Sequence, residues 1–205
     1  MTLGFRQDVS QELSSEIQEM CLKAEEMLQI AREAFRRQDS ARLGRARQLG
    51  REIHEQEKKL TQRLPGKFAA APDLGVEASY SYLPLHLERI GDNIESLVLA
   101  IQTTIKDGIP LSERAMKEID TLFEKIIELV GCMRDAIATK NKVLIRHILK
   151  EGPTYERCIS EFAVSHQERL IEGLCAPKAS SMYLALLDYL KGIESHVRQM
   201  AQKLG

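Results

Sequence analysis

The sequence predicts an all-α protein of six long helices, arranged as two tandem three-helix bundles. Apolar residues recur at spacings of three and four along almost the whole chain, which is the pattern of amphipathic helices, and no stretch alternates as a strand does. Trp is absent and aromatic residues make up 5% of the chain, which is typical of helix-on-helix cores built from Leu, Ile and Ala. The pattern of the first half also returns in the second half.

Three helices are expected in the first half of the chain. Their apolar faces run through residues 13–34, 40–64 and 83–105. Asp39 and Ser40 offer an N-cap for the second of these helices. The segment PGKFAAAPDLG, residues 65–75, is the clearest loop, and KDGIP at 106–110 is expected to end the third helix.

Three more helices are expected in the second half. Their apolar faces run through residues 111–133, 141–174 and 183–200. The middle helix begins near Asn141. We expect EGP at 151–153 to interrupt it, because proline removes a helical hydrogen bond and glycine weakens a helix.

The two halves align with each other, which indicates an internal duplication. The aligned pairs are 31–50 with 133–152, at an offset of 102, and 87–94 with 190–197, at an offset of 103. Amphipathic helices resemble one another by chance, but here the turn positions coincide as well, as Asp39 and Asn141 do, and Gly50 matches Gly152 at the same offset. We therefore expect one three-helix repeat in residues 1–108 and a second, degenerate one in residues 109–205.

Composition excludes several classes of protein. The formal net charge of −1 argues against indiscriminate nucleic-acid binding, which requires a positive excess. No run approaches the roughly 18 apolar residues that cross a bilayer, and the N-terminus shows no signal-peptide pattern. The four cysteines form no CxxC pair, so we expect reduced thiols and a cytoplasmic protein.

The stretch LERIGDNIESL, residues 87–97, places a glycine and three acids within one predicted helix. Glu88, Asp92 and Glu95 fall outside the apolar stripe, so we expect them on the exposed side. Glu88 and Asp92 are four residues apart and can reach one ion, and carboxylates suit hard or borderline cations. The alternative is a solvated acidic face. Gly91 either brings ligands of a neighbouring helix close or reflects tight helix packing.

The histidines give one further candidate. His54 and Glu57 form H-x-x-E, one turn apart on a predicted helix, and both side chains can ligate a divalent metal. Such pairs also arise by chance in charged helices. The remaining histidines have no evident partners in the sequence and are expected at the surface or at helix ends: His86, His147, His166 and His196.

Arginines are concentrated around the first predicted helical turn. Residues 32–51 contain seven arginines and two acids. Because the guanidinium group suits phosphate and carboxylate partners, this tip can dock an acidic protein surface or anionic lipid. The alternative is an ordinary solvated helix face. The candidate docking residues are Arg36, Arg37, Arg42 and Arg45.

Catalysis is not expected from this sequence. It contains no Ser-His-Asp or Cys-His set, no P-loop and no glycine-rich nucleotide motif. The paired Glu-x-x-His motifs of ferritin-like di-iron proteins are not found either. A protein that acts by binding is therefore the better prediction.

In this six-helix context the sequence resembles the PhoU family of phosphate-uptake regulators. The resemblance rests on ERIGD at 88–92 and on RRQDSARLGRA at 36–46, and it covers Glu12 to Lys203. It implies a regulator that binds the cytosolic face of a membrane phosphate transporter, and a sensor histidine kinase, with peripheral association at the membrane. The second unit, ending LKGIESHVRQM at 190–200, is also similar to the PhoU-like cytosolic tail of sodium/phosphate cotransporters.

The resemblance also implies a surface cluster of iron or zinc, held by acids of the second and third helices of a unit. Glu88 and Asp92 match the family motif, and Glu57 matches a later acid of the second helix. Gly50 and His54 stand where two other acids are expected, although a histidine can still ligate a metal.

The second unit departs further from that pattern. Counterparts of Glu88, Asp92, His54 and Glu57 are, in that order, Lys191, Ser195, Glu156 and Ile159. A family-type cluster is therefore expected only in the first unit. Two other functions stay open: a soluble companion of a sodium/phosphate cotransporter, and a metal-free helical adaptor. Exposed helical faces are compatible with a homodimer.

Overall fold

The computed structural model describes residues 2–69 and 80–205, with side chains described for 11–63 and 80–205. These residues form helices and no strands, which confirms the predicted all-α class. The helices are α1 (Thr2–Arg37), α2 (Leu43–Ala69), α4 (Leu83–Lys106), α5 (Glu113–Thr139), α6 (Lys142–Ile171) and α7 (Pro177–Leu204). No helix in the described part of the chain is both long and apolar enough to cross a membrane.

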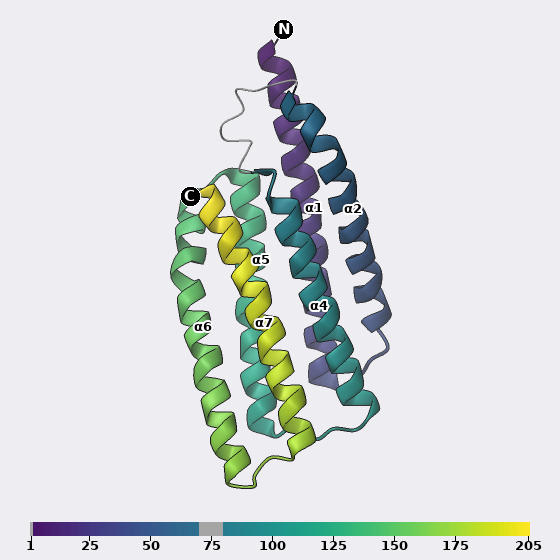
Figure 1. The fold of residues 1–205 in the computed structure, drawn as a ribbon, viewed down its shortest axis with the longest axis vertical. Coiled ribbons are helices and arrows are strands. Elements are labelled where there is room, and N and C mark those ends of the chain that lie inside the picture. Colours follow the sequence, from purple (N-terminus) through teal and green to yellow (C-terminus); the bar gives the residue numbers. More distant parts are fainter. Residues whose placement is uncertain (1, 70–79) are drawn as a thin grey trace.

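The helices run along the long axis of the molecule in two groups of three (Figure 1). Helices α1, α2 and α4 pack on one another, as do α5, α6 and α7. The groups meet where α1 contacts α5 and where α4 contacts α7. A single cluster of buried apolar side chains extends from Leu13 to Ala201 through all six helices. The two groups therefore share one continuous core.

Side-chain caps begin two of the helices. Ser112 Oγ accepts a hydrogen bond from the backbone N–H three residues on, at 3.2 Å, and starts α5. Asn141 Oδ1 accepts from the N–H two residues on, at 2.8 Å, and starts α6 near the predicted position. Asp39 instead closes a turn before α2, accepting from the N–H two residues on at 2.9 Å, so α2 begins only at Leu43.

Two expected breaks are wrong. Helix α2 continues through Pro65 and Gly66 to Ala69, so the first part of the predicted loop is helical, and residues 70–75 lie outside the described residues. Helix α6 continues through Pro153. One proline removes a single backbone donor, which a long helix packed on its neighbours can lose without ending.

Gly152 has a packing role in α6 rather than a helix-breaking one. It is buried, and a Cβ at this position would meet the Glu194 carboxylate and lie 2.9 Å from Arg198 Cδ on α7. The missing side chain therefore lets α6 approach α7 closely.

Candidate functional site

A groove of about 380 Å³ lies between α2 and α4. Its lining residues are Gly50, Arg51, His54, Glu55, Glu88, Gly91, Asp92 and Glu95. Packing of Leu87, Ile90 and Ile94 in the core fixes the rotation of α4 and turns its acidic edge towards α2. Since four carboxylates share the groove with one guanidinium, it is a site of negative charge.

Three of the four predicted metal ligands line this groove, namely His54, Glu88 and Asp92. Glu57 does not line it, and its Oε1 accepts a hydrogen bond from Thr61 Oγ1 at 2.6 Å. The side chain of Asp92 is 52% exposed, as expected. The expectation that all three acids of α4 are exposed is wrong for Glu88, whose side chain is 15% exposed, and for Glu95, which is also partly buried. The reason is that α2 covers this edge of α4.

Glu88 has an unusual environment for a carboxylate. Its Oε1 lies 3.5 Å from His54 Nδ1. Its Oε2 is buried and has no hydrogen-bond partner among the described residues. The guanidinium of Arg89 is near, with Nε at 3.6 Å from that oxygen, and it also lies 3.3 Å from Asp92 Oδ2. Arg89 therefore compensates part of the charge without hydrogen-bonding the buried oxygen.

Glu95 adds a third acid of α4 to the groove. Burial raises the pKa of its carboxyl group, and the charge of Asp92 raises it further, against the opposing effects of Arg51, Arg47 and His54. In its ionised form Glu95 therefore destabilises the folded protein, and a bound cation would reduce this destabilisation.

The two groove glycines differ in what they allow. A Cβ at Gly50 would collide with the Glu95 carboxylate, lying 2.8 Å from its Cδ, so this glycine makes room for the acid. A Cβ at Gly91 would lie 3.5 Å from Ile53 Cγ2, which is ordinary van der Waals contact. Gly50, and not the Gly91 of the ERIGD motif, is therefore the glycine that the groove requires.

The corresponding face of the second unit, between α6 and α7, is neutralised by the chain's own cations. Glu156 Oε1 lies 3.3 Å from Lys191 Nζ, and its Oε2 lies 3.2 Å from Arg198 Nη2. Arg198 Nε also donates to Glu194 Oε1 at 2.9 Å, and Glu194 is 1% exposed. Close ion pairs to Lys191 and Arg198 thus compensate the acids of this face, whereas the α2–α4 groove keeps an excess of carboxylates.

The arginine tip lies at the α1–α2 turn, where the four candidate docking residues separate into two kinds. Arg37 is 74% exposed and, within the part of the chain that the structure describes, pairs with Glu33 of its own helix alone. Arg42 is exposed in the turn. Arg36 is 56% exposed, with Nε 3.8 Å from an Asp120 oxygen. Arg45 is engaged by acids of α1 and α2. Three of the four guanidinium groups are therefore accessible to a partner.

A buried polar cluster that the sequence pattern did not predict lies between α5, α6 and α7. Glu118 accepts hydrogen bonds from Arg169 Nη1 and Nη2 at 3.0 and 2.9 Å and from Tyr183 Oη at 2.5 Å. Glu118 and Arg169 are 7% and 8% exposed. The sequence contains an indication of it, because Glu118 stands on the apolar stripe of its helix between Ala115 and Leu122.

The expected surface positions of the other histidines are wrong in part. His166 is 2% exposed, and its Nε2 lies 2.7 Å from Ser180 Oγ. His86 and His196 are half-buried where α4 meets α7, with their Nδ1 atoms 3.3 Å apart. Partners from other helices, which a single helix pattern does not show, account for each of these placements.

Comparisons with known proteins agree with the PhoU resemblance. Residues 17–101, which include the groove, match the family model for the PhoU domain. PhoU from Pseudomonas aeruginosa has a TM-score of 0.87 at 21% identity, over 95% of this chain and 94% of that one. The phosphate transport system regulatory protein PhoU from Streptococcus pneumoniae has a TM-score of 0.82 at 12% identity, over 95% and 92%. No curated protein matches the sequence. Residues 17–101 therefore match the PhoU domain, and the chain has the fold seen in these two PhoU structures.

Proposed function

We propose that this protein is a non-catalytic, cytoplasmic regulator of phosphate uptake. It acts by binding the cytosolic face of a membrane phosphate transporter, and a sensor histidine kinase that reads the transporter's state. The observation that carries the proposal is the PhoU domain of residues 17–101. The Streptococcus pneumoniae structure of the same fold is a regulatory protein of a phosphate transport system, which supports the same role here.

The proposal includes an iron or zinc ion in the α2–α4 groove, held by His54, Glu88 and Asp92. Two observations support it: the buried Glu88 Oε2 accepts no hydrogen bond, and carboxylates are in excess in the groove. A cation would coordinate the oxygen and neutralise the excess charge. Glu57 is left out of the ligand set because it does not line the groove. The bound metal would link α2 to α4.

His54, Glu88 and Asp92 are not preorganised around one metal position. Among the described residues, a single group of three metal-ligating atoms lies within 4.8 Å of one another, and it is between α5 and α6. For Asp92 to share an ion with Glu88 and His54, its carboxylate must therefore leave Arg89. We expect binding in the groove to be weaker than at a preformed site.

The first test is elemental analysis of full-length protein purified without chelator, beside Glu88→Gln/Asp92→Asn. Near-stoichiometric iron or zinc in the parent and its loss from the double variant would support the metal site. The matched control is Glu57→Gln, which removes an acid of α2 outside the groove and should keep the metal. Equal metal content in the parent and the double variant would remove the groove site from the proposal.

The regulatory role is tested separately, in cells that lack the protein. Phosphate uptake should change on deletion, and the protein should co-purify with a phosphate transporter. The charge-reversal variant Arg37→Glu/Arg42→Glu, which alters two exposed arginines of the tip, should weaken this co-purification. Unchanged uptake on deletion would refute the regulatory role whatever the metal content.

The ion pairs that fill the α6–α7 face favour one alternative, the companion of a sodium/phosphate cotransporter, because the degenerate second unit is similar to the tails of those carriers. The identity of the co-purified transporter distinguishes the two roles. A sodium/phosphate cotransporter, with no histidine kinase, would select this alternative.

A further inference from the structure

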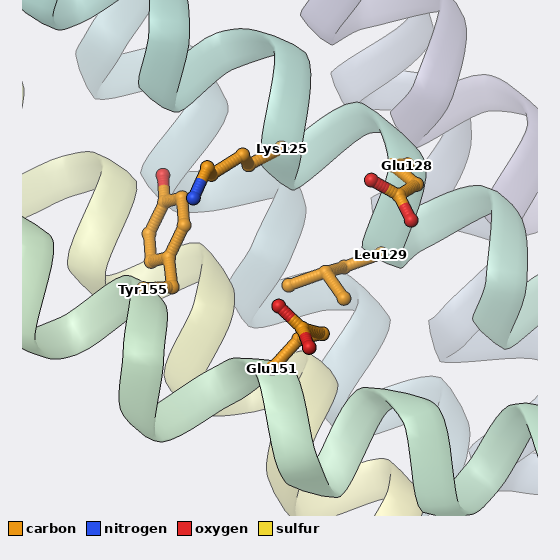
Figure 2. Close-up of a pocket in the computed structure, with 5 residues that line it drawn as sticks. All are labelled: Lys125, Glu128, Leu129, Glu151 and Tyr155. Carbon is orange, nitrogen blue, oxygen red and sulfur yellow. The ribbon is translucent and has the colours of Figure 1, made fainter.

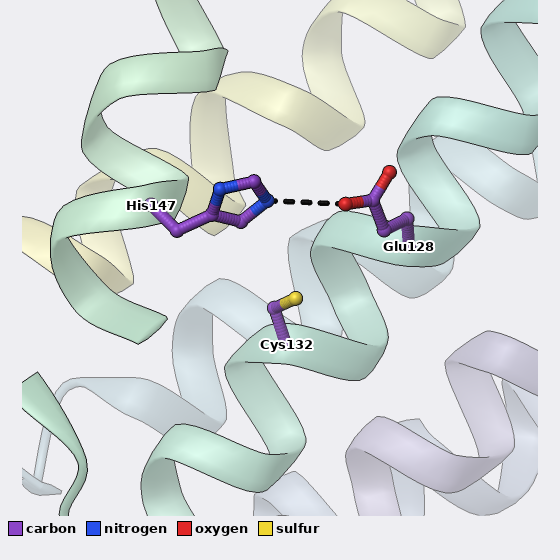
Figure 3. Close-up of side chains that lie close together, drawn as sticks. All are labelled: Glu128, Cys132 and His147. Atoms are coloured by element: carbon purple, nitrogen blue, oxygen red, sulfur yellow. Dashed lines mark hydrogen bonds and ion pairs between the residues drawn. The ribbon is translucent and has the colours of Figure 1, made fainter. Parts of the chain in front are cut away.

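A second set of metal-ligating side chains lies between α5 and α6. Glu128 and Cys132 are one turn apart on α5, and His147 faces them from α6 (Figure 3). His147 Nε2 lies 3.1 Å from Glu128 Oε1. One nitrogen, one sulfur and one carboxylate oxygen all lie within 4.8 Å of one another.

These three atoms are close to the geometry of a tetrahedral zinc site. With bonds of about 2.0 to 2.3 Å, a tetrahedral ion holds its ligand atoms about 3.3 to 3.8 Å apart. The His147 and Glu128 atoms, 3.1 Å apart, already have about this spacing. The Cys132 sulfur lies within 4.8 Å of both, so it needs to close by at most about 1.3 Å around an ion. Glu128 and His147, which are 60% and 37% exposed, have the freedom to move towards it. Thiolate with imidazole selects a borderline or soft divalent ion over Mg²⁺ or Ca²⁺.

The equivalent place in the first unit carries no such set. There, 102 residues earlier in each case, Arg45 Nε lies 3.1 Å from Glu26 Oε1 and Ile30 is buried nearby in the core cluster. The two units thus place the same kind of contact between their first and second helices. In the first unit it is a plain ion pair beside an apolar residue, and in the second the arginine and the isoleucine are replaced by a histidine and a cysteine.

A fourth ligand position is available beside the three. Glu128 also lines a groove with Glu151, which follows His147 by one turn on α6, and both carboxylates lie beside Leu129 in that groove (Figure 2). Among the described residues Glu128 has no ion-pair partner besides His147, so a cation does not have to displace a lysine or arginine from it. Glu151 lies outside the group of ligand atoms within 4.8 Å of one another, so water is the ligand that can complete a four-coordinate site.

We propose that Glu128, Cys132 and His147 form a binding site for a tetrahedral divalent d-block cation of the zinc class. The bound ion joins the middle of α5 to the first turns of α6. This site shares no residue with the α2–α4 groove and does not depend on the regulatory role.

The test is a titration of chelator-treated, full-length protein with Co²⁺, followed by optical absorption. One equivalent should give tetrahedral cobalt bands with a thiolate-to-cobalt charge-transfer band, and Zn²⁺ should displace it. Cys132→Ser should abolish the charge-transfer band. His147→Gln should weaken Co²⁺ binding more than about tenfold, since even residues that only support a ligand contribute that much.

Two controls locate the site. Cys158→Ser removes another partly buried thiol and His54→Gln removes the groove histidine, and both variants should keep the band. Absence of the band at stoichiometric Co²⁺, or its survival in Cys132→Ser, would overturn the proposal. If circular dichroism shows Cys132→Ser to be unfolded, Glu128→Gln/His147→Gln decides, because both side chains are at the surface. Unchanged Co²⁺ affinity in that variant would then refute the site.

Discussion

Replacing Arg169 by methionine is expected to destabilise the protein by about 3 kcal/mol. Arg169 donates two charge-assisted hydrogen bonds to Glu118, and the two side chains are only 10% and 8% exposed. Breaking a buried ion pair from one side costs about 3–5 kcal/mol, because the remaining charge is left uncompensated. Glu118 would keep its hydrogen bonds from Tyr183 at 2.5 Å and Arg114 at 2.9 Å, so the lower end of that range applies.

The assay is urea unfolding at neutral pH, followed by circular dichroism. In a thermal melt of a chain of this length, the same loss of about 3 kcal/mol corresponds to a fall of about 6–12 °C in Tm. The double variant Glu118→Gln/Arg169→Met should lose less stability than Arg169→Met alone, because it removes the stranded charge. A loss below about 1 kcal/mol in Arg169→Met, or a double variant that is less stable than it, would refute the reasoning.

The same pair has a defined pH dependence. Burial raises the pKa of Glu118, but the hydrogen bonds from Arg169, Tyr183 and Arg114 outweigh it and hold that pKa below its usual range. Because the folded-state pKa of Glu118 is lowered, the stabilising contribution of its ionised form is fully present above the ordinary carboxyl pKa. This contribution is lost as the pH falls through the lowered pKa. The stability gap between the parent and Arg169→Met should therefore narrow in acid, and a gap that widens there would contradict the assignment.

Three further changes test other parts of the bundle by the same unfolding assay. Gly91→Ala should stabilise the protein by up to about 1 kcal/mol, since a Cβ fits there and alanine is the better helix former; a loss above that size would show hidden crowding. Glu95→Gln should stabilise the metal-free protein at neutral pH, because burial and the charge of Asp92 raise the pKa of Glu95. That gain should vanish as the pH falls through the raised pKa to below the ordinary carboxyl value, and a gain constant with pH would argue against it. Burial lowers the pKa of both His86 and His196, so their neutral forms favour folding above the ordinary histidine pKa and stability declines as the pH falls. His86→Gln should reduce this decline between about pH 7 and 5, and an unchanged decline would exclude the pair as its cause.

The helical periodicity predicted the all-α class and most of the helices, because a core-facing stripe is a local property of the chain. The expected breaks at Pro153 and Pro65 were wrong, because the helix-breaking tendency of proline and glycine is a local property that does not include packing against neighbouring helices. Helix α6 continues through Pro153 while it packs on α7, and the reason for Gly152 lies in Glu194 and Arg198, more than 40 residues away in sequence.

The candidate site was predictable in its residues but not in its environment. Glu88, Asp92 and His54 do line one groove, yet the burial of Glu88 and the space that Gly50 leaves for Glu95 depend on how α2 lies beside α4. A helical wheel for one helix contains no such information.

The Glu128, Cys132 and His147 cluster escaped detection for the same reason. Two helices supply its members, and H-x-x-E or C-x-x-C spacing within one helix does not describe it. Comparing the two halves position by position would have indicated it, since His147 replaces Arg45 in an otherwise similar contact.

The continuous core has a consequence for how the molecule responds to its ligands. Because the apolar cluster passes through α1, α4, α5 and α7 without a gap, neither group of three helices has a separate core on which to remain folded alone. We therefore expect one cooperative unfolding transition rather than two. Stabilisation by an ion bound to either group of helices would then raise the unfolding midpoint for the entire chain. A partner bound to one group would likewise be thermodynamically linked to the other.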